Sequence, residues 1–247
     1  MLPADRVETG LRAGSLTRRF VEAQAQAHTI SFKRGSPSPH ALQFSHHFKG
    51  TYCVQNRSSG IDPDDAVLLF VDLQAGIVEL SKTIPLGRLR KGVLGLSKLA
   101  RIFGIPAIVS GVSGQDGSAP TMIPQIAEGI GTYAVQLRTT ADSFRNDAIV
   151  AAVKATHRQT LLISGVSSEV AVQLPALTAA DMGYRVFVVA DACGGMSERT
   201  EQAAIQRIGT TGGALVSVMM LAGELAGDFR TTEAQSAIGV LYEMATA

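Results

Sequence analysis

The sequence predicts an α/β protein with a doubly wound, mostly parallel six-stranded sheet that carries helices on both faces, a Rossmann-like arrangement. Two observations lead to this prediction. Short and almost continuous apolar runs alternate along the chain with segments of about 10 to 15 residues that have helical periodicity. Such apolar runs are typical of strands in a parallel sheet, because helices cover both faces of that sheet.

The first half of this pattern begins with the run AVLLFV at 66–71, a predicted buried strand that ends at Asp72. A helix is expected at 86–103, where apolar side chains recur at helical spacing, and Gly104 ends it. The next elements are expected to be a strand at 106–110, a flexible loop at 111–118, a short helix at 122–128 and a weaker strand at 133–137.

The second half repeats the alternation of strands and helices. Asn146 can cap a helix at 147–156, because its side-chain oxygen can accept hydrogen bonds from the first turn. The remaining elements are expected to be a strand at 160–164, a helix at 169–182, a strand at 185–190, a helix at 198–208, a strand at 214–218 and a helix through Leu225. The chain after about residue 230 is expected to form a helical arm that could contact another subunit.

Composition divides the chain into a basic extension at 1–61 and a predicted domain at 62–247. The extension contains eight Lys or Arg residues and only three acids. Arg and Ser with few acids are also the mark of an organellar transit peptide, but Asp5 and Glu8 count against one. A disordered extension or an over-long gene start is therefore the favoured interpretation.

The remaining composition predicts a cytoplasmic protein with no membrane and no nucleic-acid partner. Apolar residues make up 46% of the chain, yet no apolar run reaches the roughly 20 residues of a membrane helix. Cys53 and Cys193 form neither a disulfide framework nor a metal pair, and His46 and His47 lack further ligands. Beyond residue 61 the chain carries 14 basic and 18 acidic residues, which argues against nucleic acid.

Polar residues at the carboxyl ends of the predicted strands are the candidates for chemistry, because ligands of open parallel sheets bind there. Asp72 is the sharpest candidate, since an acid after an apolar strand can act as a general acid or base; the alternative is a cap or an ion pair. Arg138 could hold an anionic group or pair with Asp72, although an arginine after a strand is by default a surface residue. Glu169 and Asp191 are interpreted as first-turn and strand-end acids, and Cys193 as a structural thiol.

Missing motifs argue against several classes of enzyme. The sequence DLQAG at 72–76 stands where a G-x-G-x-x-G motif would follow the first strand, and the chain has no Walker loop. No nucleotide or other cofactor is therefore expected. No strand-to-helix turn contains G-x-S-x-G, and His157 is predicted at the far end of a helix. A Ser-His-Asp hydrolase is therefore not expected.

Three blocks of sequence have the spacing of a known fold. They are AVLLFVDLQAG at 66–76, AVKATHRQTLLISGVSSEVAV at 152–172 and PALTAADMGYRVFVVADACG at 175–194, and SERTEQAAIQRI at 197–208 follows the same pattern. Together they resemble the isochorismatase-like (cysteine hydrolase) superfamily, most closely its branch of small uncharacterised hydrolases. The resemblance covers about residues 62–230 and implies the isochorismatase-like hydrolase fold.

This resemblance implies a catalytic triad of Asp, Lys and Cys. Asp72 matches the Asp that ends the first strand, and Arg138 is the nearest match to the Lys after the third strand, where the branch is similar in tolerating Arg. The Cys position, at the start of the helix after the fourth strand, is occupied by Ala171. The expected substrate and oxyanion contacts are Gly165, Val166, Ser167, Val170 and Gln74.

No other side chain replaces the missing nucleophile on sequence grounds. The methyl group of Ala171 cannot attack a carbonyl carbon, so the acyl-enzyme route is closed at that position. Cys193 is predicted one helix and one strand away from the turn whose N–H groups would form the oxyanion hole. Ser167 and Ser168 are nearer, but neither has a histidine or a well-placed lysine to take its proton.

Three interpretations of function stay open. The favoured one is a C–N (amide-type) hydrolase scaffold in which Ala171 stands at the nucleophile position. In the second, the protein is similar to the true isochorismatases, which also lack the cysteine: Asp72 would serve the acid chemistry on a vinyl ether, Arg138 would bind a carboxylate, and water would attack. In the third, the protein is a catalytically silent binder or scaffold.

The same resemblance implies a small-molecule substrate and a homo-oligomer. It also bears on metals, because nicotinamidases of the superfamily resemble one another in carrying Asp-x-His and a further His near the second strand. Here the corresponding loop contains Asp116 and no histidine, so no metal is expected.

Overall fold

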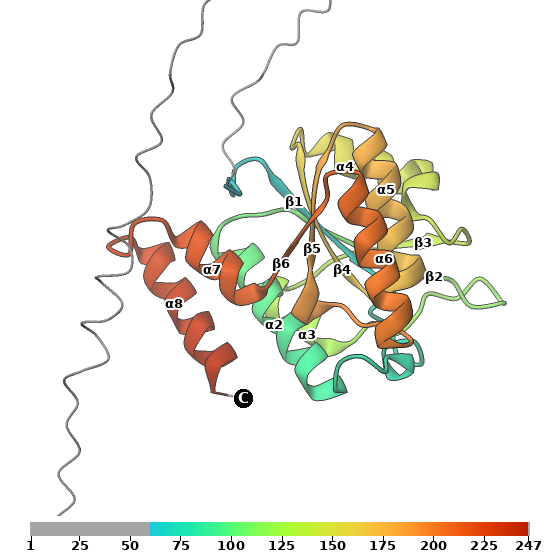
Figure 1. Ribbon diagram of the computed structural model, residues 1–247, viewed down its shortest axis with the longest axis horizontal. Helices are drawn as coiled ribbons and strands as arrows, with labels where there is room; N and C mark the ends of the chain where they lie inside the picture. The colour runs from blue at the N-terminus through green and yellow to red at the C-terminus, as the bar shows by residue number, and fades with distance from the viewer. Residues whose placement is uncertain (1–59, 247) are drawn as a thin grey trace, which may run out of the picture. The chain divides into compact units, whose positions relative to one another are not determined.

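The computed structural model describes residues 60–246, which contain a six-stranded sheet between two layers of helices (Figure 1). All neighbouring strands are parallel, and their order across the sheet is β3-β2-β1-β4-β5-β6. The strands are β1 (Ala66–Val71), β2 (Ala107–Val112), β3 (Val135–Arg138), β4 (Thr160–Gly165), β5 (Arg185–Val189) and β6 (Ala214–Val216). The predicted doubly wound α/β fold is confirmed.

Alternate residues of β1 supply the two apolar cores of the sheet. Leu68 and Phe70 belong to the core on one face and Leu69 and Val71 to the core on the other, and all four are completely buried. This two-sided burial explains why the strand reads as one continuous apolar run. The first core lies under α2 (Leu86–Ile102), α3 (Pro124–Ile130), α7 (Val218–Ala226) and α8 (Thr232–Ala245), and the second under α4 (Asp147–Ala155), α5 (Gln173–Asp181) and α6 (Glu198–Thr210).

The predicted boundary at residue 62 lies close to the start of the described chain. Ile61 is buried in the first core, and its N–H donates to Glu224 Oε1 at 2.7 Å. The rest of the predicted extension, with His46, His47 and Cys53, lies outside the described residues. Within residues 60–246, no helix has the length and apolar character needed to cross a membrane.

Three predicted boundaries near the carboxyl edge of the sheet were wrong by a few residues. Ser110 does not end the second strand, because β2 continues to Val112. Arg138 is the last residue of β3 rather than a residue beyond it. The helix predicted at 169–182 begins as a π-helical turn, Ser168–Val172, before the regular turns of α5. β2 and β3 are therefore longer than predicted at the edge where ligands bind, and the helical segment after β4 begins one residue earlier.

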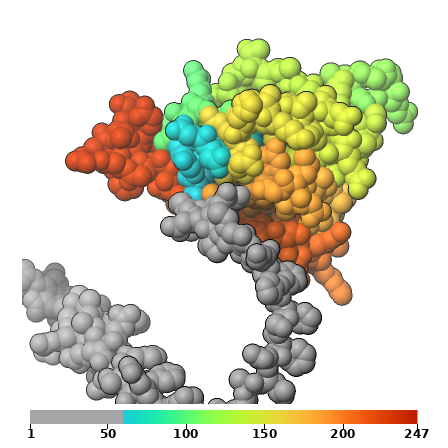
Figure 2. Space-filling model, turned by 90° about the horizontal axis from the view of Figure 1, so that it is seen from above, coloured from blue at the N-terminus to red at the C-terminus, as the bar shows by residue number. Residues whose placement is uncertain are grey.

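The C-terminal segment is helical, as predicted, but it is not a free arm. Ala234, Ala237 and Val240 of α8 are buried in the first core, and a Cβ placed on Gly95 of α2 would lie 3.1 Å from Met244 Sδ. The opposite side of α8 is open, since Tyr242 is 70% exposed. In the space-filling view the red C-terminal segment lies at one side of the described part of the chain (Figure 2). One face of α8 is therefore available to a neighbour, and the other belongs to this domain.

The direction in which the strands are added reverses between β1 and β4. Helices α2 and α3, which connect β1 to β2 and β2 to β3, cover one face, whereas α4 and α5 cover the other. The chain thus turns in opposite directions on the two sides of the β1–β4 pair, and ligands of open α/β sheets bind at this switch point. The two strands approach closely there, because a Cβ on Gly165 would lie 2.3 Å from the carbonyl oxygen of Val71.

Candidate active site

Asp72 follows β1 directly and turns its side chain to the carboxyl edge of the sheet. Its φ angle is 53°, in the left-handed region that non-glycine residues seldom adopt, although Asp tolerates it better than most. Its N–H donates to the carbonyl oxygen of Ser110 in β2 at 3.0 Å, which fixes the turn, and only 5% of the residue is exposed. Backbone strain of this kind often accompanies a side chain with a function.

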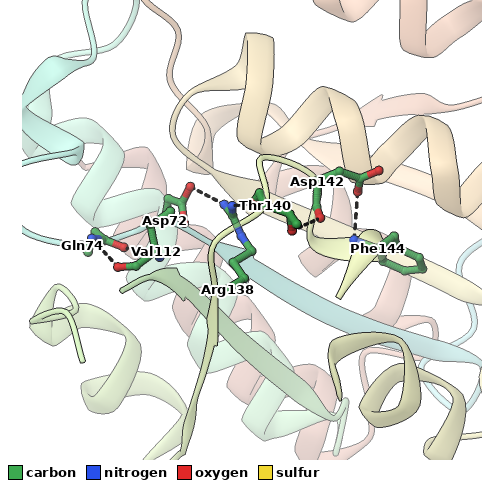
Figure 3. Close-up of polar contacts among 7 residues, drawn as sticks. All are labelled: Asp72, Gln74, Val112, Arg138, Thr140, Asp142 and Phe144. Atoms are coloured by element: carbon green, nitrogen blue, oxygen red, sulfur yellow. Dashed lines mark hydrogen bonds and ion pairs between the residues drawn. The ribbon is translucent and has the colours of Figure 1, made fainter. Parts of the chain in front are cut away.

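Arg138 forms a buried ion pair with Asp72 (Figure 3). Its Nη2 donates to Asp72 Oδ2, and its Nη1 donates to the carbonyl oxygen of Thr140. The default expectation of a surface arginine was wrong, since Arg138 is 3% exposed. The alternative that the sequence left open, an ion pair with Asp72, explains this burial, although the two residues lie 66 positions apart along the chain.

The pair leaves two polar atoms available in a buried place. Asp72 Oδ1 and Arg138 Nε are buried and have no hydrogen-bond partner among the described residues. Leaving such atoms without a partner costs about 1–3 kcal/mol each, and more when the group is charged. A polar substrate group or an ordered water at this edge would satisfy them.

Burial shifts the pKa of Asp72. Burial raises the pKa of Asp72, and the charge and hydrogen bond of Arg138 offset only part of the rise. An arginine guanidinium keeps its proton under all conditions in which proteins fold, so it can bind anions but cannot act as a base. Asp72 is therefore the member of the pair that can donate or accept a proton.

Gln74, predicted as a substrate contact, holds the end of β2. Its Oε1 accepts the N–H of Val112 at 3.0 Å, and its Nε2 donates to the Val112 carbonyl oxygen at 3.4 Å (Figure 3). Val112 is the register partner of Arg138 in the sheet. The amide of Gln74 thus positions the strand that lies between Asp72 and Arg138.

The turn after β4 contains the predicted oxyanion contacts Gly165, Val166, Ser167 and Val170. It includes a cis peptide bond between Val166 and Ser167. The N–H of Val166 donates to the Val71 carbonyl oxygen at 3.3 Å, and the N–H of Val170 donates to that of Ser167 at 3.3 Å. These two N–H groups are therefore already bonded, and an oxyanion would have to be bound by other donors of the turn.

Two acids hold this turn against the chain that follows β5. Ser168 Oγ donates to Glu201 Oε1 at 2.7 Å, and Glu169 Oε1 accepts from the Met196 N–H at 2.8 Å and from Thr200 Oγ1 at 2.6 Å. Burial acts to raise the pKa of Glu169, but these hydrogen bonds outweigh it and lower the pKa below its usual value. Glu169 does more than the predicted first-turn acid, because it joins two loops of the edge.

Ala171 lies within the π-helical turn and faces the interior. It is 3% exposed and belongs to the same apolar core as Val71 and Phe144. Single π-helical turns occur often at functional sites, where they redirect one side chain. The turn therefore presents at position 171 a side chain without a nucleophilic atom.

Cys193 lies much closer to this turn than its place in the sequence suggests. The N–H of the next residue, Gly194, donates to the Gly165 carbonyl oxygen at 3.2 Å, and the N–H of Ser168 donates to the Gly194 carbonyl oxygen at 2.9 Å. The prediction that Cys193 lies apart from the turn was thus wrong for its backbone. Its thiol is buried, however, and burial raises its pKa to about 12. A thiol with that pKa is a poor nucleophile at neutral pH.

Asp191 has a structural partner, and His157 lies where it was predicted. Asp191 Oδ1 accepts the N–H of Val218 at 2.9 Å at the start of α7, and burial raises the Asp191 pKa more than this bond lowers it. His157 follows the end of α4, as predicted. Within residues 60–246, His, Cys, Asp and Glu form no group of three or more that could hold a metal ion. The expected absence of a metal remains a prediction.

A cavity of about 210 Å³ opens beside Arg138 and is also lined by Ser113, Leu137, Thr139 and Asn146. A larger cavity, of about 420 Å³, lies near Ile105 and Tyr133, where β2 and β3 begin. Because ligands of open parallel sheets bind at the carboxyl ends of the strands, the smaller cavity is the better candidate of these two, although Asp72 does not line it.

Comparison with known proteins agrees with the fold. The family model of the isochorismatase domain matches residues 66–219. Probable hydrolase YcaC of Escherichia coli K12 is 36% identical over 171 residues, which are 69% of this chain and 82% of that protein.

Two solved structures extend this likeness. YcaC from Pseudomonas aeruginosa, with hexane-2,5-diol and covalent acrylamide, superposes with a TM-score of 0.70 at 30% identity and covers 76% of this chain and 95% of its own. The Escherichia coli YcaC gene product, described as an octameric hydrolase of unknown specificity, has a TM-score of 0.70 at 32% identity and covers 77% of this chain and 92% of its own.

The raised pKa of Cys193 predicts an unreactive thiol. At pH 8 we expect iodoacetamide to modify Cys193 in the folded protein at least about 10³-fold more slowly than in urea, because the thiolate is scarce and the side chain is buried. Mass spectrometry of the Cys193 peptide, read separately from the Cys53 peptide, measures the two rates. Modification at the same rate in both states would show that Cys193 is an accessible nucleophile.

Proposed function

The chain belongs to the isochorismatase family of hydrolases, and we propose that its site binds small amides, the substrates of a C–N hydrolase. Ala171 stands at the position of the nucleophile and prevents the covalent step of that reaction. The buried Asp72–Arg138 pair carries the proposal. It supplies a titrating acid and a fixed cation at the carboxyl ends of β1 and β3, as an amide hydrolase would need for proton transfer and orientation.

The step that Ala171 prevents is the attack of a thiolate on the amide carbonyl. A cysteine hydrolase attacks the amide carbonyl with a thiolate, releases the amine and hydrolyses the acyl-enzyme with water. Asp72 could take the thiol proton and return it to the leaving amine. With Ala171 in place the first bond cannot form, so the native chain is proposed to bind small amides without rapid turnover.

The Pseudomonas relative, which carries a covalent acrylamide, supports this substrate class. Acrylamide is both a small amide and an electrophile that alkylates thiolates. This adduct on a relative is a reason to test small amides on this chain. The cavity of about 210 Å³ beside Arg138 is in keeping with a ligand of few atoms.

Restoring the nucleophile should therefore restore chemistry. We expect Ala171→Cys to raise kcat/KM for a panel of small aliphatic and aromatic amides by at least about 10³-fold over the native chain. The variant should also gain one acrylamide adduct in intact-mass spectra. Adding Asp72→Asn to Ala171→Cys should remove most of the gain, because the proton acceptor is lost.

Val170→Cys is the matched control for this experiment. Val170 precedes Ala171 and is 45% exposed, so its cysteine would be an ordinary surface thiol. Equal amide turnover by both cysteine variants, or none by Ala171→Cys in a folded protein, would contradict the proposed C–N hydrolase.

A second candidate function is vinyl-ether hydrolysis of the isochorismate type, without a covalent intermediate. The observation that favours it is the raised pKa of Asp72 together with the buried, unpartnered Oδ1. A carboxylic acid that keeps its proton to a higher pH can protonate the vinyl ether, after which water attacks. Arg138 would bind a carboxylate of the substrate.

For this second function, the unmodified protein should consume isochorismate, and Asp72→Asn should abolish the activity. Since Asp72 acts as an acid here, the rate should be high while it is protonated and should fall as pH rises through its pKa, which lies above the usual 3.8. A pH–rate profile measured by loss of isochorismate absorbance tests the sign. If neither isochorismate nor the amides react with any variant, but one of them still binds to the folded protein, the protein is a binding protein without catalytic activity.

We also propose that the protein is a homo-oligomer. The Escherichia coli YcaC gene product is described as octameric, and large apolar side chains of this chain are exposed on and around α7 and α8. These side chains are Leu215, Met219, Met220, Phe229 and Tyr242. Clusters of exposed apolar side chains commonly mark subunit contacts.

Sedimentation velocity at micromolar concentration tests the assembly. We expect a species several times heavier than the 25.9 kDa chain, and a shift toward the single chain in Met220→Glu, because a buried charge would oppose the contact. Ser236→Glu, an exposed change on the polar side of α8, serves as the control. A native protein that sediments as one chain would exclude the proposal.

A further inference from the structure

We propose that Thr178 and Asp142 are positioning residues that fix the direction in which Arg138 donates to Asp72. The inference rests on the proposed role of the Asp72–Arg138 pair in the site. It concerns the loop between β3 and α4, and the helix α5, which continues from the turn that contains Ala171.

The orientation of the guanidinium depends on two acceptors, and only one of them is Asp72. Nη2 of Arg138 donates to Asp72 Oδ2, whereas Nη1 donates to the carbonyl oxygen of Thr140. The remaining donor, Nε, has no partner among the described residues. A guanidinium is planar, so the acceptor on Nη1 determines where Nη2 points. The position of the Thr140 carbonyl therefore controls the contact with Asp72.

Asp142 holds the loop that carries this carbonyl (Figure 3). Thr140 Oγ1 donates to the Asp142 carbonyl oxygen at 2.8 Å, and Asp142 Oδ1 accepts the N–H of Phe144 at 2.9 Å. Asp142 Oδ2 accepts the hydroxyl of Thr178 on α5 at 2.6 Å. Asp142 is only 5% exposed, so its carboxylate depends on these donors.

Other charges near Asp142 are too exposed to replace the hydroxyl of Thr178. Arg145 Nε lies 3.6 Å from Asp142 Oδ2, but the Arg145 side chain is 78% exposed, and such pairs contribute little. Asp181 and Arg207 line the same cavity, and no contact joins either of them to the carboxylate of Asp142. Thr178 is therefore the anchor that ties the loop to α5.

A loop released from this anchor has space to move. Thr140, Asp142 and Thr178 line a cavity of about 410 Å³. Loss of the Thr178 hydroxyl would leave Asp142 Oδ2 without a buried donor and let the carboxylate turn toward that cavity. The Thr140 carbonyl would then lose its fixed place, and Arg138 would hold Asp72 less firmly.

Thr178→Val tests the proposal, because valine keeps the shape of threonine and removes only the hydroxyl. We expect the pKa of Asp72 to rise further, since a less firmly held Arg138 lowers it less. Carboxyl ¹³C NMR of the native chain and the variant measures this titration, with Asp72→Asn to assign the resonance. Arg138 is the only charged side chain in contact with Asp72 among the described residues, so the shift reports on this pair.

Two matched variants separate positioning from a general loss of structure. Thr178→Ser keeps the hydroxyl and should leave the Asp72 titration unchanged. Thr210→Val should also leave it unchanged, because Thr210 Oγ1 bonds only the Arg207 carbonyl oxygen of its own helix. If Thr178→Val does not fold, Thr140→Val, which removes the bond to the Asp142 carbonyl, should raise the pKa in its place.

An unchanged Asp72 titration in folded Thr178→Val, or an equal shift in Thr178→Ser, would overturn the proposal. The measurement needs no substrate, so it is independent of the proposed hydrolase activity. A shift in Thr178→Val together with an inactive Ala171→Cys would reject the amide hydrolase and retain the positioning role. Turnover by Ala171→Cys without any shift would do the reverse.

Discussion

The carboxylate of Asp72 and the guanidinium of Arg138 are both withdrawn from water, so each depends on the other for its place in the fold. Asp72 follows β1 and Arg138 ends β3, with β2 between them, so the arginine side chain has to cross about two strand spacings, or roughly 10 Å. Removing one member of such a pair typically costs about 3–5 kcal/mol, because the other charge stays buried. The two hydrogen bonds between Gln74 and the backbone of Val112 support this pair, because they fix the end of β2, the strand between Asp72 and Arg138.

The turn after β4 is built independently of any nucleophile. Its geometry is held by Ser168 and Glu169, whose partners lie in the chain after β5, and by the close approach of Gly165 to Val71. None of these contacts involves the side chain of Ala171, which packs into the apolar core. The shape of the turn therefore does not depend on a nucleophile at position 171.

The sequence was sufficient for the sheet and for the position of Asp72, because continuous apolar strands and strand-end acids are local signals. It was insufficient for Arg138, whose burial depends on a partner across β2, and for Cys193, whose backbone reaches the turn only through the pairing of Val166 with Gly194. Asp142 and Thr178 gave no signal at all, since an acid in a loop and a threonine in a helix are common on surfaces. The roles of Gly165, Ser167 and Val170 toward a substrate stay predictions.

The strand order also determines when the residues of the candidate site can come together as the chain folds. β1, β2 and β3 lie next to one another in sequence order, so the half of the site that contains Asp72 and Arg138 can assemble from one continuous stretch. The other half requires β4 to dock on the free side of β1, at a separation of almost a hundred residues from Val71 to Gly165. Contacts of such high contact order form slowly. During synthesis the ion pair can therefore precede the turn, which can join it only after β4 has left the ribosome.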